Sequence, residues 1–227
     1  GGAQALHHRP GGGGLDELAA EGAALRARHW QAQRDAGITV IPSNDFSFYD
    51  QVLDITALLG AVPDRFGPVG ERVTLAQYFA MARGTQDAPA MEMTKWFDTN
   101  YHYIVPEFTR DQSFALASRK PVEDFLEARA LGHQTRPVLV GPLTWLSLGK
   151  AKEPGLDPIA LLPRVLPVYA QVLRELADGV LPLLSTNPAL RDVRVDTGDA
   201  STELSVSVDR ERAAAYGFNP QQIAQFV

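Results

Sequence analysis

The sequence comprises 227 residues, of which 45% are hydrophobic, and this composition is typical of a globular protein with a substantial core. The formal net charge of −6 leaves no broad basic face that could neutralise phosphates, which argues against a nucleic-acid partner. The absence of cysteine excludes disulfides and thiolate metal sites, and the sequence has no apolar run long enough to span a membrane.

Residues 1–14 are rich in glycine and contain the adjacent His7 and His8. This composition predicts a flexible leader rather than a secretory signal, and metal contact by the two histidines is the less favoured alternative. The next segment repeats apolar or small residues at helical spacing, which predicts an amphipathic helix ending near Gly37. The repeated positions are Leu15, Leu18, Gly22, Leu25, His29 and Ala32.

Residues 38–41 form a short β-branched run, and the Pro-Ser-Asn-Asp sequence of residues 42–45 should end it. We therefore expect a buried strand followed by a loop. Residues 46–59 again have a helical period. Residues 60–70 form a connection rich in proline and glycine, and residues 73–83 can form a further helix.

Residues 84–92 are expected to form a loop, whereas residues 95–105 alternate aromatic and polar side chains and predict one extended strand. Asp98, Asn100 and His102 would then lie on one face of that strand. An acid–base pair is one interpretation of Asp98 and His102. Hydrogen-bonded structural roles are the preferred interpretation, because nothing in the sequence places a substrate beside them.

Further along the chain, residues 121–131 have a helical period. Residues 137–140 are continuously apolar, and a strand is expected there. Asp157 is a good N-cap and Pro158 suits the first position of the helix that follows. Pro167 lies inside this helix and should kink it. The apolar stripe of the helix consists of Leu162, Val165, Tyr169, Val172 and Leu176.

The alternation of strands and helices predicts an α/β fold with a parallel sheet. About three to four strand–helix units can be counted, so we expect a partial (β/α) barrel followed by a small α+β tail. Polar residues follow two of the strands directly, at Ser43–Asp45 and at Gly141–Trp145. In a barrel of this kind, ligands bind at the ends of the strands where these residues would lie.

Four segments carry a family resemblance, namely residues 25–38, 42–53, 92–103 and 136–146. In order and spacing they are similar to the amino-terminal domain of cobalamin-independent methionine synthase, and the similarity covers residues 15–178. The resemblance implies a cytoplasmic methyltransferase of methionine biosynthesis, which transfers a methyl group from 5-methyltetrahydrofolate polyglutamate to homocysteine.

The resemblance also implies which parts of that enzyme this sequence contains. The family binds zinc in its carboxy-terminal half through a histidine, a glutamate and two cysteines, so no cofactor, no metal ligand and no catalytic residue is expected here. The lysine of the family's Lys-Trp-Phe motif helps to bind the glutamate tail of the folate, and it falls on Lys95. A solvated surface lysine is the alternative interpretation. Residues 1–14 stand where the family has a second tail-binding segment, so folate binding itself is an open question.

Other polar residues receive structural interpretations. His29 is expected to be a packed helix residue rather than a ligand. Ser43 and Ser47 have no histidine at the spacing that a serine nucleophile needs. Asp45 and Asp50 fit no metal-binding pattern.

Residues 182–227 differ in character from the segment before them. Two alternating strands at residues 190–196 and 203–209 precede a helix at residues 210–216 that Gly217 should close. This order resembles the periplasmic porter domain of resistance-nodulation-division efflux pumps, and a divergent tail of the preceding domain is the alternative. The sequence therefore predicts a fragment of the methyltransferase that is not catalytic alone, because the zinc-binding half is missing. A transport-related interaction module and a chimeric chain without selected function are the alternatives.

Overall fold

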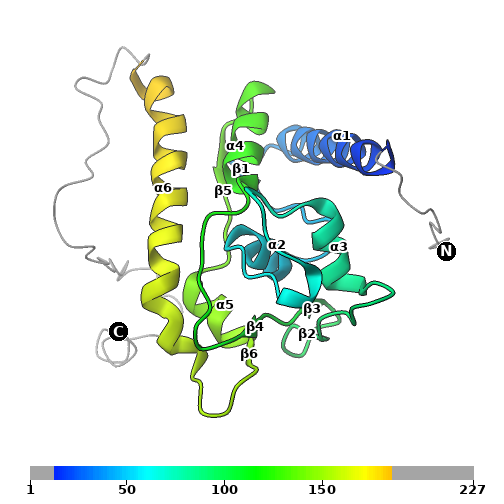
Figure 1. Ribbon diagram of the computed structural model, residues 1–227. Helices are drawn as coiled ribbons and strands as arrows, with labels where there is room; N and C mark the ends of the chain where they lie inside the picture. The colour runs from blue at the N-terminus through cyan, green and yellow to red at the C-terminus, as the bar shows by residue number, and fades with distance from the viewer. Residues whose placement is uncertain (1–12, 186–227) are drawn as a thin grey trace. The chain divides into compact units, whose positions relative to one another are not determined.

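The computed structural model describes residues 13–185 (Figure 1). In this range the helices are α1 (Gly13–Asp35), α2 (Gln51–Leu58), α3 (Leu75–Arg83), α4 (Lys120–Ala130), α5 (Pro142–Leu148) and α6 (Leu162–Ser185), with short 3-10 helices at Asp64–Phe66 and Pro158–Leu161. The strands are β1 (Ile41–Ser43), β2 (Met93–Lys95), β3 (His102–Ile104), β4 (Glu107–Phe108), β5 (Thr135–Pro137) and β6 (Lys150–Ala151). Residues 186–227, which make up most of the predicted tail at residues 182–227, and most of the leader lie outside this range.

The strands form three separate two-stranded sheets rather than one continuous sheet. β1 pairs with β5 and β4 pairs with β6, both in parallel, whereas β2 and β3 form an antiparallel pair. The mixed α/β class is therefore confirmed. Within residues 13–185 no closed barrel is present, and the expected parallel sheet is represented by the separate pairs β1–β5 and β4–β6.

Strand β1 begins three positions later than its β-branched run suggests. Ile38 and Val40 are 44% and 40% exposed, whereas Ile41 is buried. The N–H of Ile41 donates to the carbonyl oxygen of Gln134, and the carbonyl oxygen of Ser43 accepts from Val138. Pairing with a segment far along the chain therefore sets the strand, and the expected buried strand at residues 38–41 is wrong.

Strand β5 is displaced in the opposite direction. The apolar run at residues 137–140 predicts a strand there, but the strand covers Thr135–Pro137, and Val138 is 45% exposed. Apolar character alone does not locate a strand, because the segment must also find a hydrogen-bonding partner. Here β1 offers one only up to Ser43.

A turn interrupts the extended strand that was expected at residues 95–105. Phe97 has a φ of +50°, which an extended strand cannot contain. The hydroxyl of Thr99 donates to the carbonyl oxygen of Trp96 at 2.6 Å, and the N–H of Trp96 donates to the carbonyl oxygen of Tyr101. The prediction that Asp98 shares a strand face with His102 is therefore wrong, because Asp98 lies in the turn of a β2–β3 hairpin.

Helix boundaries follow the capping residues closely. Thr74 and Gln77 form a capping box at the start of α3, and Asp157 accepts from the N–H of Ile159 at 3.0 Å ahead of α6. Helix α2 begins at Gln51 rather than at residue 46, because Asp50 is its N-cap. The helix expected from residue 46 is therefore too long at its start.

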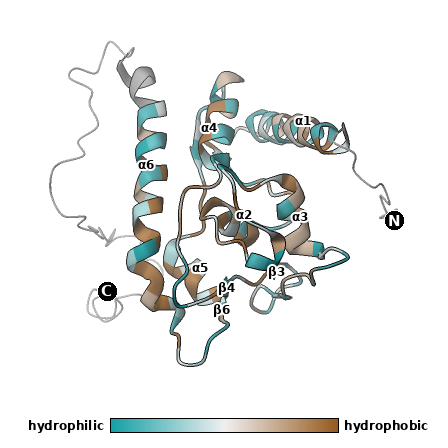
Figure 2. Cartoon of the chain, in the orientation of Figure 1, coloured by the Kyte–Doolittle hydropathy of each residue, from teal (hydrophilic) through white to brown (hydrophobic). Residues whose placement is uncertain are grey.

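The core lies around α2, which is shown as largely hydrophobic in Figure 2 and has six of its eight residues buried. Trp145 on α5 is fully buried, and its Nε1–H donates to Thr56 at 3.1 Å. Helix α6 contacts both α4 and α5 and is continuous through Pro163, Pro167 and Pro182. Its predicted stripe is confirmed at Val165, Val172 and Leu176, all of which are buried. None of the described helices is both long and apolar enough to cross a membrane.

Candidate functional site

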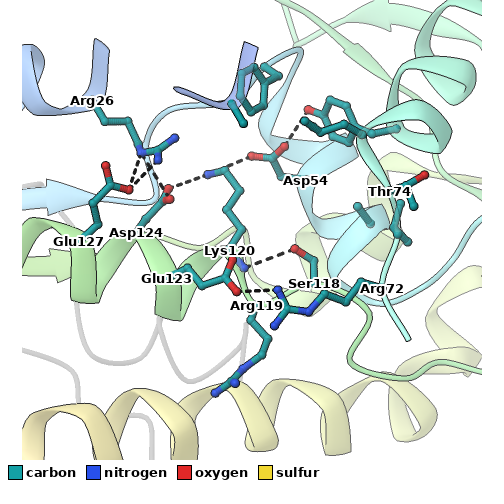
Figure 3. Close-up of a pocket in the computed structure, with 16 residues that line it drawn as sticks. Arg26, Asp54, Arg72, Thr74, Ser118, Arg119, Lys120, Glu123, Asp124 and Glu127 are labelled. Atoms are coloured by element: carbon teal, nitrogen blue, oxygen red, sulfur yellow. Dashed lines mark hydrogen bonds and ion pairs between the residues drawn. The ribbon is translucent and has the colours of Figure 1, made fainter. Parts of the chain in front are cut away.

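A lysine on α4 connects acidic side chains from two helices. The Nζ of Lys120 lies 3.0 Å from Oδ2 of Asp124, one turn further along α4, and 3.4 Å from Oδ2 of Asp54 on α2. It also donates to Oδ1 of Asn44 at 2.8 Å. Figure 3 shows Lys120 between the two carboxylates. Because the side chains of Asp54 and Asp124 are only 11% and 5% exposed, the ammonium compensates for burying their charges.

Asp54 is further held by two hydroxyl groups. Tyr78 on α3 donates to Oδ1 at 2.7 Å, and Ser47 donates to Oδ2 at 2.8 Å. Burial raises the pKa of Asp54, while the charge of Lys120 and the two hydroxyl bonds act in the opposite direction. Burial, together with the neighbouring Asp54, also raises the pKa of Tyr78 and keeps its phenol protonated as the donor.

Asp50 is a buried carboxylate with three backbone donors. Its Oδ1 accepts from the N–H groups of Val52 and Leu53 at 2.7 and 2.8 Å, and its Oδ2 accepts from Ile104 on β3 at 2.9 Å. Burial raises its pKa to about 6, although these hydrogen bonds favour the ionised form. Asp50 therefore joins α2 to the hairpin, and its saturated oxygens leave it little capacity to act on a ligand.

The first of two cavities beside Asp54 measures about 290 Å³ and lies among α1, α2, α3 and α4 (Figure 3). Its basic side chains are all paired within the described residues. Arg26 contacts Glu127, Arg72 contacts Glu123 at 2.7 Å, Arg119 contacts Glu175 at 2.8 Å, and Lys120 contacts Asp124. An anionic ligand would have to displace one of these carboxylates, so the charges favour a structural role for this cavity.

The second cavity measures about 350 Å³, and we call it the strand-end cavity because it lies where β1 and β5 end. Asn44 and Asp45 line it from the β1 side, and Gly141 and Thr144 line it from the β5 side. These are the two polar segments that the sequence places after its strands, and the structure brings them together. Ser43 and Trp145 belong to the same two polar segments, but they are buried and do not line the cavity.

Lys95 is the last residue of β2 and lies opposite His102 in the hairpin. Its side chain is exposed and forms no ion pair with any residue between 13 and 185. The adjacent Trp96 lines the strand-end cavity, and Phe97 is 72% exposed. The predicted binding residue therefore stands at an accessible aromatic hairpin.

His102 and His29, the two histidines singled out in the sequence, have different surroundings in the structure. Nδ1 of His102 lies 3.0 Å from the carbonyl oxygen of Asn100, which fits the structural role that was preferred. His29 is exposed, so the expectation that it packs against the core is wrong. The buried face of α1 contains Trp30 instead, which is 1% exposed. Within residues 13–185 no three histidine, aspartate or glutamate side chains gather as metal ligands would.

Sequence reasoning missed the Asn44–Lys120–Asp54 arrangement. Asn44 and Lys120 are 76 positions apart, and Lys120 lies in none of the four segments that carry the family resemblance. Asn44 has a φ of +58°, and its Nδ2 donates to the carbonyl oxygen of Val138 at 2.7 Å. The one local signal was the Asn-Asp pair after a strand, because asparagine tolerates this backbone conformation better than most residues.

Comparison with known proteins gives one family match. The model of the family described as "Cobalamin-independent synthase, N-terminal domain" matches residues 13–191.

Several relatives are named 5-methyltetrahydropteroyltriglutamate–homocysteine methyltransferase. That of Mesorhizobium japonicum is 57% identical over 178 residues, which cover 70% of this chain and 23% of the relative. That of Nitrobacter winogradskyi is 55% identical over 174 residues, which cover 68% of this chain and 23% of the relative. That of Salinibacter ruber is 50% identical over 208 residues, which cover 88% of this chain and 26% of the relative. The chain thus spans about a quarter of the length of these relatives.

Proposed function

The chain belongs to the family of the cobalamin-independent synthase N-terminal domain, and we propose that it is the part of a 5-methyltetrahydropteroyltriglutamate–homocysteine methyltransferase that helps to hold the glutamate tail of the folate. The observation that carries the proposal is the exposed Lys95 on the β2–β3 hairpin, inside the segment that the family model matches. In this proposal the chain does not transfer the methyl group alone.

Lys95 differs from the other lysines of the chain in its surroundings. Lys120, Lys150 and Lys152 each have a carboxylate within reach, at 3.0, 2.6 and 3.6 Å. Lys95 has no such partner among the described residues, so its ammonium can meet a carboxylate without first breaking an ion pair. A triglutamate tail offers several carboxylates to an ammonium on a flexible stem.

Methyl transfer itself is proposed for the remaining three quarters of the relatives' length. Zinc, when bound, keeps a thiol deprotonated as a nucleophile. The described residues contain no suitable ligand group, and the sequence has no cysteine, so we derive no step through zinc for this chain.

We also propose that the parallel pairs β1–β5 and β4–β6 are parts of a partial (β/α) barrel. The exposure of Val40 and Val138, at 40% and 45%, supports this, because both lie next to a two-stranded sheet whose outer edges are unpaired within the described residues. A cytoplasmic location stays a prediction.

The resemblance of residues 182–227 to an efflux-pump porter domain also stays a prediction. One comparison favours the alternative of a divergent tail. The Salinibacter ruber relative covers 88% of the chain, whereas residues 1–181 make up only about 80% of it. That alignment therefore extends into the segment assigned to the porter, as does the family match that ends at residue 191.

Isothermal titration of the 227-residue chain with 5-methyltetrahydropteroyltriglutamate tests the proposed function. We expect saturable binding that Lys95→Ala weakens about fivefold, since an exposed charge contact contributes roughly 1 kcal/mol. Lys152→Ala is the matched control and should bind as the unmodified chain does. Equal binding by both variants would contradict the role of Lys95, and an absence of heat at millimolar ligand would contradict folate binding altogether.

A further inference from the structure

The charged residues that line the strand-end cavity are both acidic. Asp45 and Asp54 line it, together with the neutral amides of Asn44 and Gln51. Among the described residues that line it, none is lysine, arginine or histidine. The cavity therefore disfavours carboxylates and phosphates and attracts a positive group.

The negative charge at this cavity is only partly compensated. Lys120 is the nearest cation to Asp54, at 3.4 Å, but it lies closer to Asp124, at 3.0 Å. Asp45 is exposed at the rim and has no hydrogen bond or ion pair to any side chain in the described range. Asp45 is thus a carboxylate that a ligand can contact directly.

The remaining wall of the cavity is apolar and aromatic. Trp96, Ile55 and Leu139 contribute to it, with Val138 at 45% exposure. Phe97, Tyr101 and Tyr103 surround the Trp96 ring edge to face, with centroids at 5.4, 6.4 and 5.9 Å, and so hold it in one orientation. A held tryptophan ring is the aromatic group that interacts best with an organic cation.

These features distinguish between kinds of cation. A divalent metal is disfavoured, because no group of three or more ligating side chains occurs within residues 13–185. An amino acid is disfavoured as well, since its carboxylate would find no basic partner on the cavity wall. We propose that the strand-end cavity binds a small organic cation, an ammonium or amidinium group joined to an apolar or aromatic body and lacking a carboxylate. This inference does not rest on folate binding by Lys95.

Tryptophan fluorescence of the full 227-residue chain provides the test. Trp30 and Trp145 are 1% and 0% exposed, so Trp96 is the tryptophan that an added ligand can reach. Three probes of similar size are titrated, namely 2-phenylethylamine, 2-phenylethanol and 3-phenylpropionate. We expect a saturable change with the amine and a markedly weaker response to the alcohol and the acid. Equal responses to all three probes, or no saturation with the amine at millimolar concentration, would overturn the proposal.

Two charge-neutralising variants locate the binding. Asp45→Asn should weaken amine binding about two- to fivefold, in line with a single exposed charge contact. Asp98→Asn makes the same charge change on the nearby hairpin turn, outside the cavity, and should leave the affinity unchanged. Equal weakening by both variants would show diffuse attraction to an acidic protein and overturn the site. Because Asp45 is exposed and has no partner in the described structure, its replacement should leave the fold intact, which circular dichroism checks.

Discussion

The carboxylate of Asp50 at the start of α2 accepts a hydrogen bond of 2.9 Å from the backbone N–H of Ile104 on β3. The same carboxylate caps α2, and it is only 1% exposed. One side chain therefore satisfies backbone donors from a helix and from a hairpin that pack together in the core.

Replacement of Asp50 by alanine should destabilise the fold strongly. The change removes an N-cap worth about 1 kcal/mol and leaves the buried N–H of Ile104 without an acceptor, which costs a further 1–3 kcal/mol or so. We expect urea unfolding to give a loss of about 2–4 kcal/mol. Asp98→Ala, at an exposed turn position, is the control and should cost far less. A loss below about 1 kcal/mol for Asp50→Ala would contradict the dual role.

The pKa of Asp50 predicts a dependence of stability on pH. Because burial raises the pKa of the folded carboxyl from 3.8 to about 6, the folded state binds its proton more tightly than the unfolded state does. This contribution is present in full below pH 3.8 and is lost as the pH rises through about 6. The stability of the unmodified chain relative to Asp50→Asn should therefore decrease between about pH 4 and pH 7, by no more than roughly 3 kcal/mol. A relative stability that rises over this range in urea titrations would contradict it.

Replacement of Lys120 by methionine should reveal the charges that it compensates. The variant leaves Asp54 without its cation and Asp124 with only Arg26, at 3.5 Å. Breaking a buried pair in this way costs about 3–5 kcal/mol, and partial exposure of the lysine reduces this to about 2–4 kcal/mol. Lys152→Met removes a lysine that is 53% exposed and should change stability by less than about 1 kcal/mol. Equal stabilities of the two variants would show that Lys120 is not needed for the fold.

Gly149 should not tolerate alanine. A Cβ atom at this position would lie 2.6 Å from Cζ of Phe108, and even closer to its Cε2, and 2.9 Å from the carbonyl oxygen of Pro106. Because Phe108 is fully buried, its ring has no free space to move into, and we expect a loss of about 1–3 kcal/mol in thermal unfolding. Gly141→Ala is the control, since a Cβ atom added there would have nothing within 4 Å. A neutral Gly149→Ala would mean that the ring adapts.

The parts of the fold that could be predicted from the sequence are those with local causes. Asp157 lies directly beside the helix that it was expected to cap, and the helix expected at residues 73–83 begins at the equally local capping box of Thr74 and Gln77. The positions of β1 and β5 could not be predicted in this way, because each depends on a partner about 94 residues away. Phe97 supplied no turn signal, since an aromatic residue rarely adopts a positive φ.

In the candidate site, too, the residues with a local sequence signal could be predicted and those that meet only after folding could not. Lys95 could be nominated because it lies in a contiguous motif, and its exposure fits that role. The polar residues after β1 and β5 could be placed near a cavity because parallel strands end on the same side. The link from Lys120 to Asp54 and Asn44 could not, because three separate segments must fold before those atoms meet.

The two oxygens of Asp50 also differ in when they can find their partners during folding. Oδ1 bonds to donors two and three residues away, so it can support α2 while the rest of the chain is still unfolded. Oδ2 bonds to a donor 54 residues away and must wait until that long loop has closed. A single carboxylate thus joins a contact that is local in the sequence to one that exists only once α2 and β3 have packed together.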